Sequence, residues 1–126
     1  SSPAALDAAV VALTLAPARR RVAILGDMLE LGEAGPRLHR EAGKALAGQV
    51  DAVIGVGPLS KELVDGARAE GLAADAGWHF EDAPAAVEAV GDLVRPGDAV
   101  LVKASRGVQL ETVVDALVAR FGGGVA

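Results

Sequence analysis

The first candidate for chemistry is an acid, Asp27, which follows the apolar run Val22–Leu25. The run is short and wholly apolar, as expected for a strand covered on both faces of a parallel sheet. A carboxylate at the end of such a strand can bind an amine or a ribose hydroxyl, or it can cap the turn that follows. We expect residues 26–32 to form the main functional loop. Its apolar residues would either line a pocket or pack beneath a neighbouring domain: Met28, Leu29 and Leu31.

A second candidate is the segment Lys103–Gly107, which follows another apolar run at 99–102. It places two cations, Lys103 and Arg106, on either side of the hydroxyl of Ser105 and just before an expected helix. Cations, a hydroxyl and the N–H groups of a helix N-terminus together favour an anion such as a carboxylate or a phosphate. The alternative is a solvated turn in which Ser105 caps the helix. The local residues leave both interpretations open.

Other reactive residue types form no recognisable site. The segment Gly55–Lys61 faintly resembles a phosphate-binding loop, but it lacks the four-residue spacer and the second glycine, so we exclude that interpretation. No Gly-x-Gly-x-x-Gly fingerprint follows any expected strand. His39 and His79 have no partner at metal-ligand spacing, and we expect structural or surface roles for both. We therefore predict no metal site and no catalytic residue within this chain.

The elements that must position these loops alternate between helix and strand. Ser2-Pro3 is typical of a helix start, and apolar residues recur at helical spacing after it. We predict helices at 3–15, 36–48, 59–70, 84–94 and 108–121, and strands at 21–26, 51–58, 78–80 and 99–103. We expect the second helix to point Leu38, Ala42, Ala45 and Leu46 toward the core. The inward-facing residues expected of the last helix are Leu110, Val113, Val114, Leu117 and Phe121.

This order predicts one α/β domain with a mostly parallel sheet of four strands and helices on both faces. The carboxyl ends of parallel strands share one edge of a sheet, which is where open α/β sheets bind their ligands. Both candidate loops would meet there. Four strands are few for such a sheet, and we expect that the first strands of the domain precede this chain.

Composition supports a single core-forming domain and narrows the partners. The chain has 126 residues, of which 52% are hydrophobic, and a formal net charge of −5. The acidic balance argues against a nucleic-acid surface, and the one basic run, Arg19–Arg21, is expected at a solvated edge. No apolar run is long enough to cross a membrane. Zero cysteines fit a reducing cytosol.

Three blocks of the sequence closely resemble the C-terminal part of bacterial Mur ligases. The first is Arg20–Gly32, with the motif Leu-Gly-Asp-Met-Leu-Glu-Leu-Gly; the second is His39–Gly43; the third is Asp98–Gly107. The motif is most similar to that of the branch that adds D-alanyl-D-alanine to UDP-N-acetylmuramoyl-tripeptide. The resemblance implies a Rossmann-like third domain of a cytoplasmic, ATP-dependent ligase of peptidoglycan precursor synthesis. ATP and Mg²⁺ would then be bound mainly by a central domain outside this chain.

The resemblance also implies residue roles. In related ligases an acyl phosphate is attacked by the amine of the incoming group, which the C-terminal domain holds. Asp27–Leu31 would shape the dipeptide pocket, and Ser105 with Arg106 would meet its free carboxylate. The chain departs from the family pattern in having Ala104 where a glycine is usual, and it lacks the upstream Asp-x-Tyr-Asn-Ala-Asn-Pro segment.

The competing hypothesis is a free-standing α/β binding or regulatory module without catalysis. The parent reading frame distinguishes the two hypotheses. A Gly-x-x-Gly-Lys-Ser/Thr loop upstream of Ser1 supports the ligase, whereas a start codon just before Ser1 supports the module.

Overall fold

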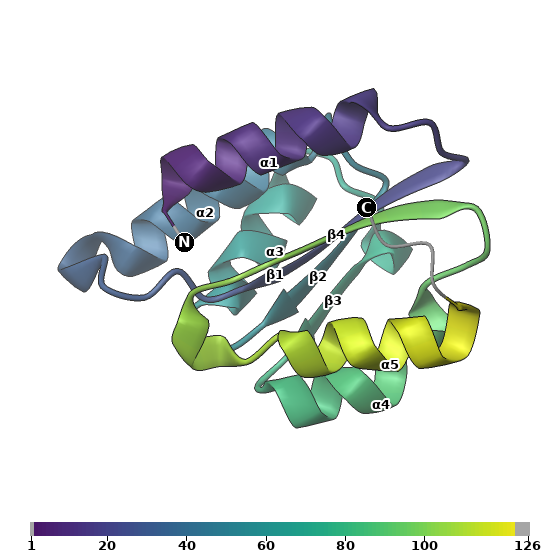
Figure 1. Ribbon diagram of the computed structural model, residues 1–126. Helices are drawn as coiled ribbons and strands as arrows, with labels where there is room; N and C mark the ends of the chain where they lie inside the picture. The colour runs from purple at the N-terminus through teal and green to yellow at the C-terminus, as the bar shows by residue number, and fades with distance from the viewer. Residues whose placement is uncertain (1, 123–126) are drawn as a thin grey trace.

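A computed structural model describes residues 2–122, apart from the side chain of Arg106, and it has the predicted alternation of helix and strand (Figure 1). Residues 1 and 123–126 lie outside the described part. The helices are α1 (Pro3–Leu15), α2 (Gly35–Leu46), α3 (Ser60–Ala69), α4 (Ala83–Leu93) and α5 (Glu111–Phe121). The strands are β1 (Arg20–Gly26), β2 (Ala52–Val56), β3 (Gly77–Phe80) and β4 (Asp98–Lys103). Short 3-10 turns lie at Gly32–Ala34, Ala74–Ala76 and Arg106–Val108.

The four strands form one parallel sheet in the order β3-β2-β1-β4. Ile24 at the centre of β1 lies opposite Ile54 of β2 and Val102 of β4. Helices α1, α2 and α3 cover one face, and α4 and α5 cover the other (Figure 1). The prediction of a three-layer α/β domain is therefore confirmed.

Alternate residues of β1 serve the two halves of the core. Ala23 and Leu25 pack on the side of α1–α3, whereas Val22 and Ile24 pack on the side of α4 and α5. All four are at most 1% exposed, as the continuous apolar run predicted for a strand with both faces covered. Full burial of one such aliphatic side chain stabilises a fold by roughly 1.5–3 kcal/mol. The central strand thus fixes the position of the loop that follows it.

Helices α2 and α3 approach each other through glycines. A Cβ added to Gly43 would lie 1.8 Å from the carbonyl oxygen of Leu63, and one added to Gly66 would lie 2.2 Å from that of Arg40. The buried residues of α2 are accordingly Gly35, His39, Gly43 and Leu46. The predicted inner face was wrong in part, since Ala45 is exposed and Leu38 is only half-buried. A prediction based on apolar side chains misses this helix contact, because the contact is made by glycines, which have no side chain.

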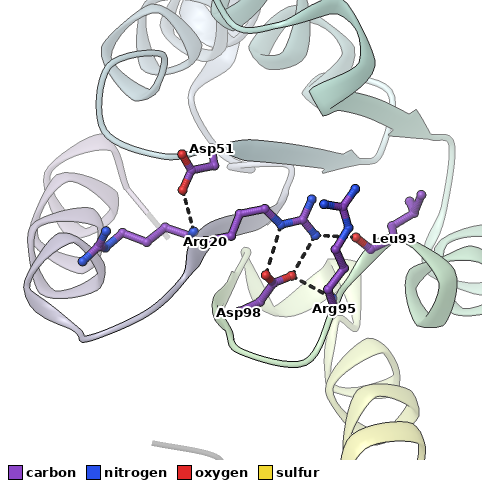
Figure 2. Close-up of polar contacts among 6 residues, drawn as sticks. Arg20, Asp51, Leu93, Arg95 and Asp98 are labelled. Carbon is purple, nitrogen blue, oxygen red and sulfur yellow. Dashed lines mark hydrogen bonds and ion pairs between the residues drawn. The ribbon is translucent and has the colours of Figure 1, made fainter.

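The end of the sheet opposite the candidate loops is tied by an arginine (Figure 2). Arg20 donates from Nε and Nη2 to the Asp98 carboxylate at 3.1 and 2.7 Å, and from Nη2 to the Leu93 carbonyl at 2.7 Å. The hydrogen bond that Arg20 donates to Asp98 is the main cause that raises the pKa of Arg20. The expectation of a solvated basic edge holds for Arg19 but is wrong for Arg20 and Arg21, which are half-buried because their guanidinium groups bind backbone carbonyls.

The last helix starts later than predicted. A 3-10 turn at Arg106–Val108 and a left-handed Gln109 precede α5, which begins at Glu111 rather than at residue 108. Phe121 was predicted to point inward, yet it is 38% exposed. It is the last residue of α5.

Candidate functional site

The two candidate loops leave the sheet at neighbouring strands and turn to opposite faces. The loop after β1 leads to α2 on one face, whereas the loop after β4 leads to α5 on the other (Figure 1). Adjacent parallel strands whose connections diverge in this way create a crevice at their carboxyl ends, where α/β proteins bind ligands. The strand order thus places residues 26–32 and 103–107 together, as the sequence predicted.

Hydrogen bonds join these two loops. The N–H of Ser105 donates to the carbonyl oxygen of Asp27 at 3.2 Å. The N–H of Leu29 donates to the hydroxyl oxygen of Ser105 at 2.9 Å. A Cβ on Gly26 would lie 2.6 Å from the Cβ of Ala104, so the loops also touch where they leave the sheet. Ser105 is consequently a bridge between the loops, and its side chain makes no capping bond to the helical turn that follows it.

Asp27 is buried, with 4% of its surface exposed, and its carboxylate is engaged by the start of α3. One oxygen accepts from the N–H of Ser60 at 2.8 Å and from its hydroxyl at 2.7 Å, and the other accepts from the N–H of Leu59 at 3.1 Å. Gly57 makes room for it, because a Cβ there would lie 2.6 Å from the carboxylate. A cap for the turn that follows Asp27 was one of the roles left open by the sequence, but the carboxylate instead caps a helix that starts 33 residues away.

Met28 is also buried, at 2% exposed, and its backbone N–H donates to Nε2 of His39 at 2.9 Å. His39 itself is fully buried on α2. The structural role expected of this histidine is confirmed. Neither His39 nor Ser60 was singled out as part of the loop's support. The sequence signal that could have identified them is a polar residue among the inward-facing positions of α2 and of α3.

The apolar residues of the loop after β1 separate into buried and exposed members. Met28 and the half-buried Leu31 pack against the core on the α1–α3 side. Leu29 points outward with 39% of its surface exposed, and its Cδ1 lies 3.1 Å from where a Cβ on Gly107 would be. Leu29 is therefore the most exposed apolar side chain of this loop, followed by the half-buried Leu31.

The second loop, after β4, does not lead directly into α5 as predicted. Because α5 begins at Glu111, its N-terminal amides do not lie at Ser105, contrary to the sequence prediction. Lys103 and Ser105 are half-buried and line a hollow of about 280 Å³ beside β4, together with Val102, Ala104, Leu110, Glu111 and Val114. The hydroxyl and the ammonium group of this loop supply donors suited to an anion.

Residues 2–122 have neither a membrane-spanning helix nor a metal-binding cluster of side chains. No helix there is long and apolar enough to cross a membrane. In the same residues, no three or more His, Cys, Asp or Glu side chains are grouped so as to hold a metal ion. The chemistry that the geometry supports is recognition of a small polar molecule by two joined loops.

Comparison with known families agrees with this arrangement. Residues 1–106 match the family model described as the Mur ligase, glutamate ligase domain. The chain belongs to the Mur ligase family. Among curated proteins, the UDP-N-acetylmuramoyl-tripeptide–D-alanyl-D-alanine ligase of Bacillus subtilis is 32% identical over 120 residues, which cover 94% of this chain and 26% of that protein. The ligase of the same name from Mycobacterium leprae is 39% identical over 110 residues, covering 80% and 20%.

Solved structures of Mur ligases share the fold. MurF from Acinetobacter baumannii matches with a TM-score of 0.83 and 24% identity, covering 94% of this chain and 26% of that one. MurF from Thermotoga maritima, solved in complex with ADP, matches with a TM-score of 0.74 and 27% identity, covering 95% and 26%. The chain thus spans about a quarter of the length of the Mur ligases that it matches.

Proposed function

We propose that this chain is the C-terminal domain of an ATP-dependent ligase that joins D-alanyl-D-alanine to UDP-N-acetylmuramoyl-tripeptide. The similar curated proteins carry this activity in their names. The observation that carries the proposal is the pair of hydrogen-bonded loops at the point where the connections of β1 and β4 diverge. The loops hold donors for an anion and an exposed apolar side chain within one small region.

The role of this domain is to hold the dipeptide. D-Alanyl-D-alanine has one amine, which must attack the acyl phosphate, and one free carboxylate, which must be held away from it. Ser105 and Arg106 are the carboxylate donors in this proposal, and Leu29 with Leu31 forms the apolar side of the pocket. Asp27 and Met28 shape the pocket from behind, because their polar groups bind α3 and α2.

The other requirements of the reaction belong to the rest of the protein. ATP with Mg²⁺ and the UDP-linked tripeptide would be bound mainly by domains outside this chain, in the cytoplasm. When bound there, ATP supplies the phosphoryl group that activates the tripeptide carboxylate. This domain closes over the site and excludes water that would hydrolyse the acyl phosphate. On its own it would not bind Mg-ATP appreciably or catalyse ligation.

We also propose that the sheet continues past β4 in the intact protein. Helix α1 packs on β1 and β4, on the same face as α2. A right-handed crossover that places α1 on this face and then enters β1 must start from a strand on the side of β1 away from β2. Since β4 already pairs with β1 on that side, the additional strand would lie against the outer edge of β4.

The dipeptide assignment is tested in the full-length ligase by removing either the free carboxylate of the dipeptide or the residues proposed to bind it. A hydrogen bond to a charged group is worth roughly 1.5–3 kcal/mol, or about a tenfold to hundredfold change in affinity. We expect Ser105→Ala or Arg106→Ala to raise the dipeptide KM by that factor while kcat falls less. A dipeptide amidated at its C-terminus should lose a similar factor with the wild type and little more with the variants.

Two results would contradict the assignment. One is an amidated dipeptide that loses as much affinity in the variants as in the wild type. The other is a double Ser105→Ala, Arg106→Ala variant with an unchanged KM. Thr112→Ala is a suitable control, because its hydroxyl bonds only to the nearby Gln109 carbonyl on the exposed start of α5.

A further inference from the structure

The buried imidazole of His39 makes two hydrogen bonds that connect α2 to the loop after β1. Its Nε2 lies 2.9 Å from the backbone nitrogen of Met28, and its Nδ1 lies 2.6 Å from the carbonyl oxygen of Gly35. The ring is fully buried, and both of its nitrogens have a partner. The contact to Gly35 is local to the helix, whereas the contact to Met28 crosses between two elements.

The two partners determine the protonation of the ring. The Met28 nitrogen is a backbone N–H and can only donate, so Nε2 must accept and carry no proton. The Gly35 oxygen can only accept, so Nδ1 must carry the proton and donate. His39 is therefore the neutral Nδ1–H tautomer. A proton added to Nε2 would set two N–H groups against each other.

We propose that His39 is a positioning residue for dipeptide binding. It fixes the loop after β1 in the conformation that presents Leu29 and Leu31. This inference rests on the proposed function of that loop. Three consecutive residues are each anchored to a different element: the Asp27 carboxylate to α3, the Met28 N–H to α2 and the Leu29 N–H to Ser105.

The Met28 anchor is the one that determines which side chain of the loop faces out. Met28 is 2% exposed and Leu29 is 39% exposed, so these two neighbouring side chains point to opposite sides, Met28 into the core and Leu29 toward the surface. Without an acceptor at Nε2, the buried Met28 N–H would be left unsatisfied, which favours any loop conformation that exposes it to water. Leu29 would then lose its place beside Ser105.

The first test measures the loop in the chain itself. His39→Phe keeps an aromatic ring of similar size but removes both nitrogens, whereas His39→Gln retains an amide oxygen that can accept from Met28. We expect amide hydrogen exchange at Met28 and Leu29 to become about tenfold faster in His39→Phe, with exchange in β2 unchanged. His39→Gln should restore it to within about threefold. The wild-type ring should also show the ¹⁵N NMR signature of a protonated Nδ1 and an unprotonated Nε2.

His79→Phe is the matched control. It removes an imidazole that also bonds a backbone group, but from β3, where its partner is the Gly57 carbonyl at 2.7 Å rather than a group of the loop after β1. Exchange at Met28 should stay within about twofold of wild type in this variant. If His39→Phe folds and its Met28 exchange also stays at the wild-type rate, the inference is overturned. A protonated Nε2 in the wild type at neutral pH would overturn it as well.

The second test measures dipeptide use in the full-length ligase. We expect His39→Phe to raise the dipeptide KM by about tenfold, with the KM for ATP unchanged, kcat within about twofold, and recovery in His39→Gln. If Ser105→Ala raises the dipeptide KM but His39→Phe does not, the site stands and the positioning role is overturned. If neither variant changes it, the proposed function fails, and the exchange measurement alone decides whether His39 holds the loop.

Discussion

At the scale of single residues, Asp27 shows how a motif acid can serve the fold and the site together. Its carboxylate accepts three hydrogen bonds from two residues at the start of α3 and is almost wholly buried. Its backbone carbonyl accepts from Ser105 in the other loop. A change at Asp27 therefore alters the support of the pocket before it alters any contact to a ligand.

We predict that Asp27→Ala destabilises the domain by about 3 kcal/mol, because it removes the acceptor of the buried Ser60 hydroxyl and of the half-buried Leu59 N–H. In the full-length ligase, a variant that remains folded should use the dipeptide poorly while ATP binding is intact. Chemical denaturation of the chain and calorimetry of the ligase measure these effects. Asp82→Ala is the matched control, since Asp82 is an exposed helix cap with one bond to the Ala85 N–H and should cost about 1 kcal/mol. An equal loss in both variants would contradict the prediction.

At the residue scale, the sequence predicted which residues lie at the site but not which side chains support them. Asp27 and Ser105 could be selected because parallel strands bring their carboxyl ends to one edge. The partners that hold the loop after β1 could not be selected, since Ser60 binds Asp27 across 33 positions of chain and His39 binds Met28 across 11. Such contacts depend on how α2 and α3 sit on the sheet. Periodicity within one helix does not specify this.

At the scale of elements, boundaries set by local chemistry were predictable. Ser2 caps α1 through its side chain, as the Ser2-Pro3 pattern predicted, and Asp82 caps α4 in the same way. The start of α5 was misplaced, because no capping residue marks it and a 3-10 turn comes first. The inner face of α2 was misassigned because its closest contact to α3 is made through glycine.

This contact gives a prediction for α2. Gly43→Ala should destabilise the domain by about 2 kcal/mol, even though alanine favours a helix over glycine by about 1 kcal/mol, because its methyl group collides with the Leu63 backbone. Gly91→Ala in α4 is the control: the added methyl meets only Arg120 side-chain atoms, at 3.3 Å or more, which can move. It should be neutral or stabilising by up to about 1 kcal/mol. Denaturant titration of both variants measures the difference, and a neutral Gly43→Ala would refute the close helix contact.

At the scale of the whole molecule, the alternation of elements predicted the fold class but left the strand order open. Strands β2 and β1 are internal, β3 and β4 form the two edges of the sheet, and these edges differ. Strand β3 is short, whereas every residue of β4 is half-buried. Exposed apolar side chains lie on both helices beside β4: Val11 and Leu15 of α1, and Val118 and Phe121 of α5. The β4 edge is where the additional strand proposed above would pair.

The last prediction follows from that asymmetry. If a strand preceding α1 pairs with β4, extending the chain upstream with its parent sequence should slow amide exchange in β4 and leave β3 unchanged. Covering on the order of 100 Å² of apolar surface should also raise the free energy of unfolding by about 2.5 kcal/mol. A proline at the centre of the added segment is the control, because it removes a ladder hydrogen bond and should cancel much of the gain. Slower amide exchange in β3 instead of β4 would show that the added strand pairs with β3, and the prediction would be wrong. It would show that α1 does not enter the sheet by a right-handed crossover.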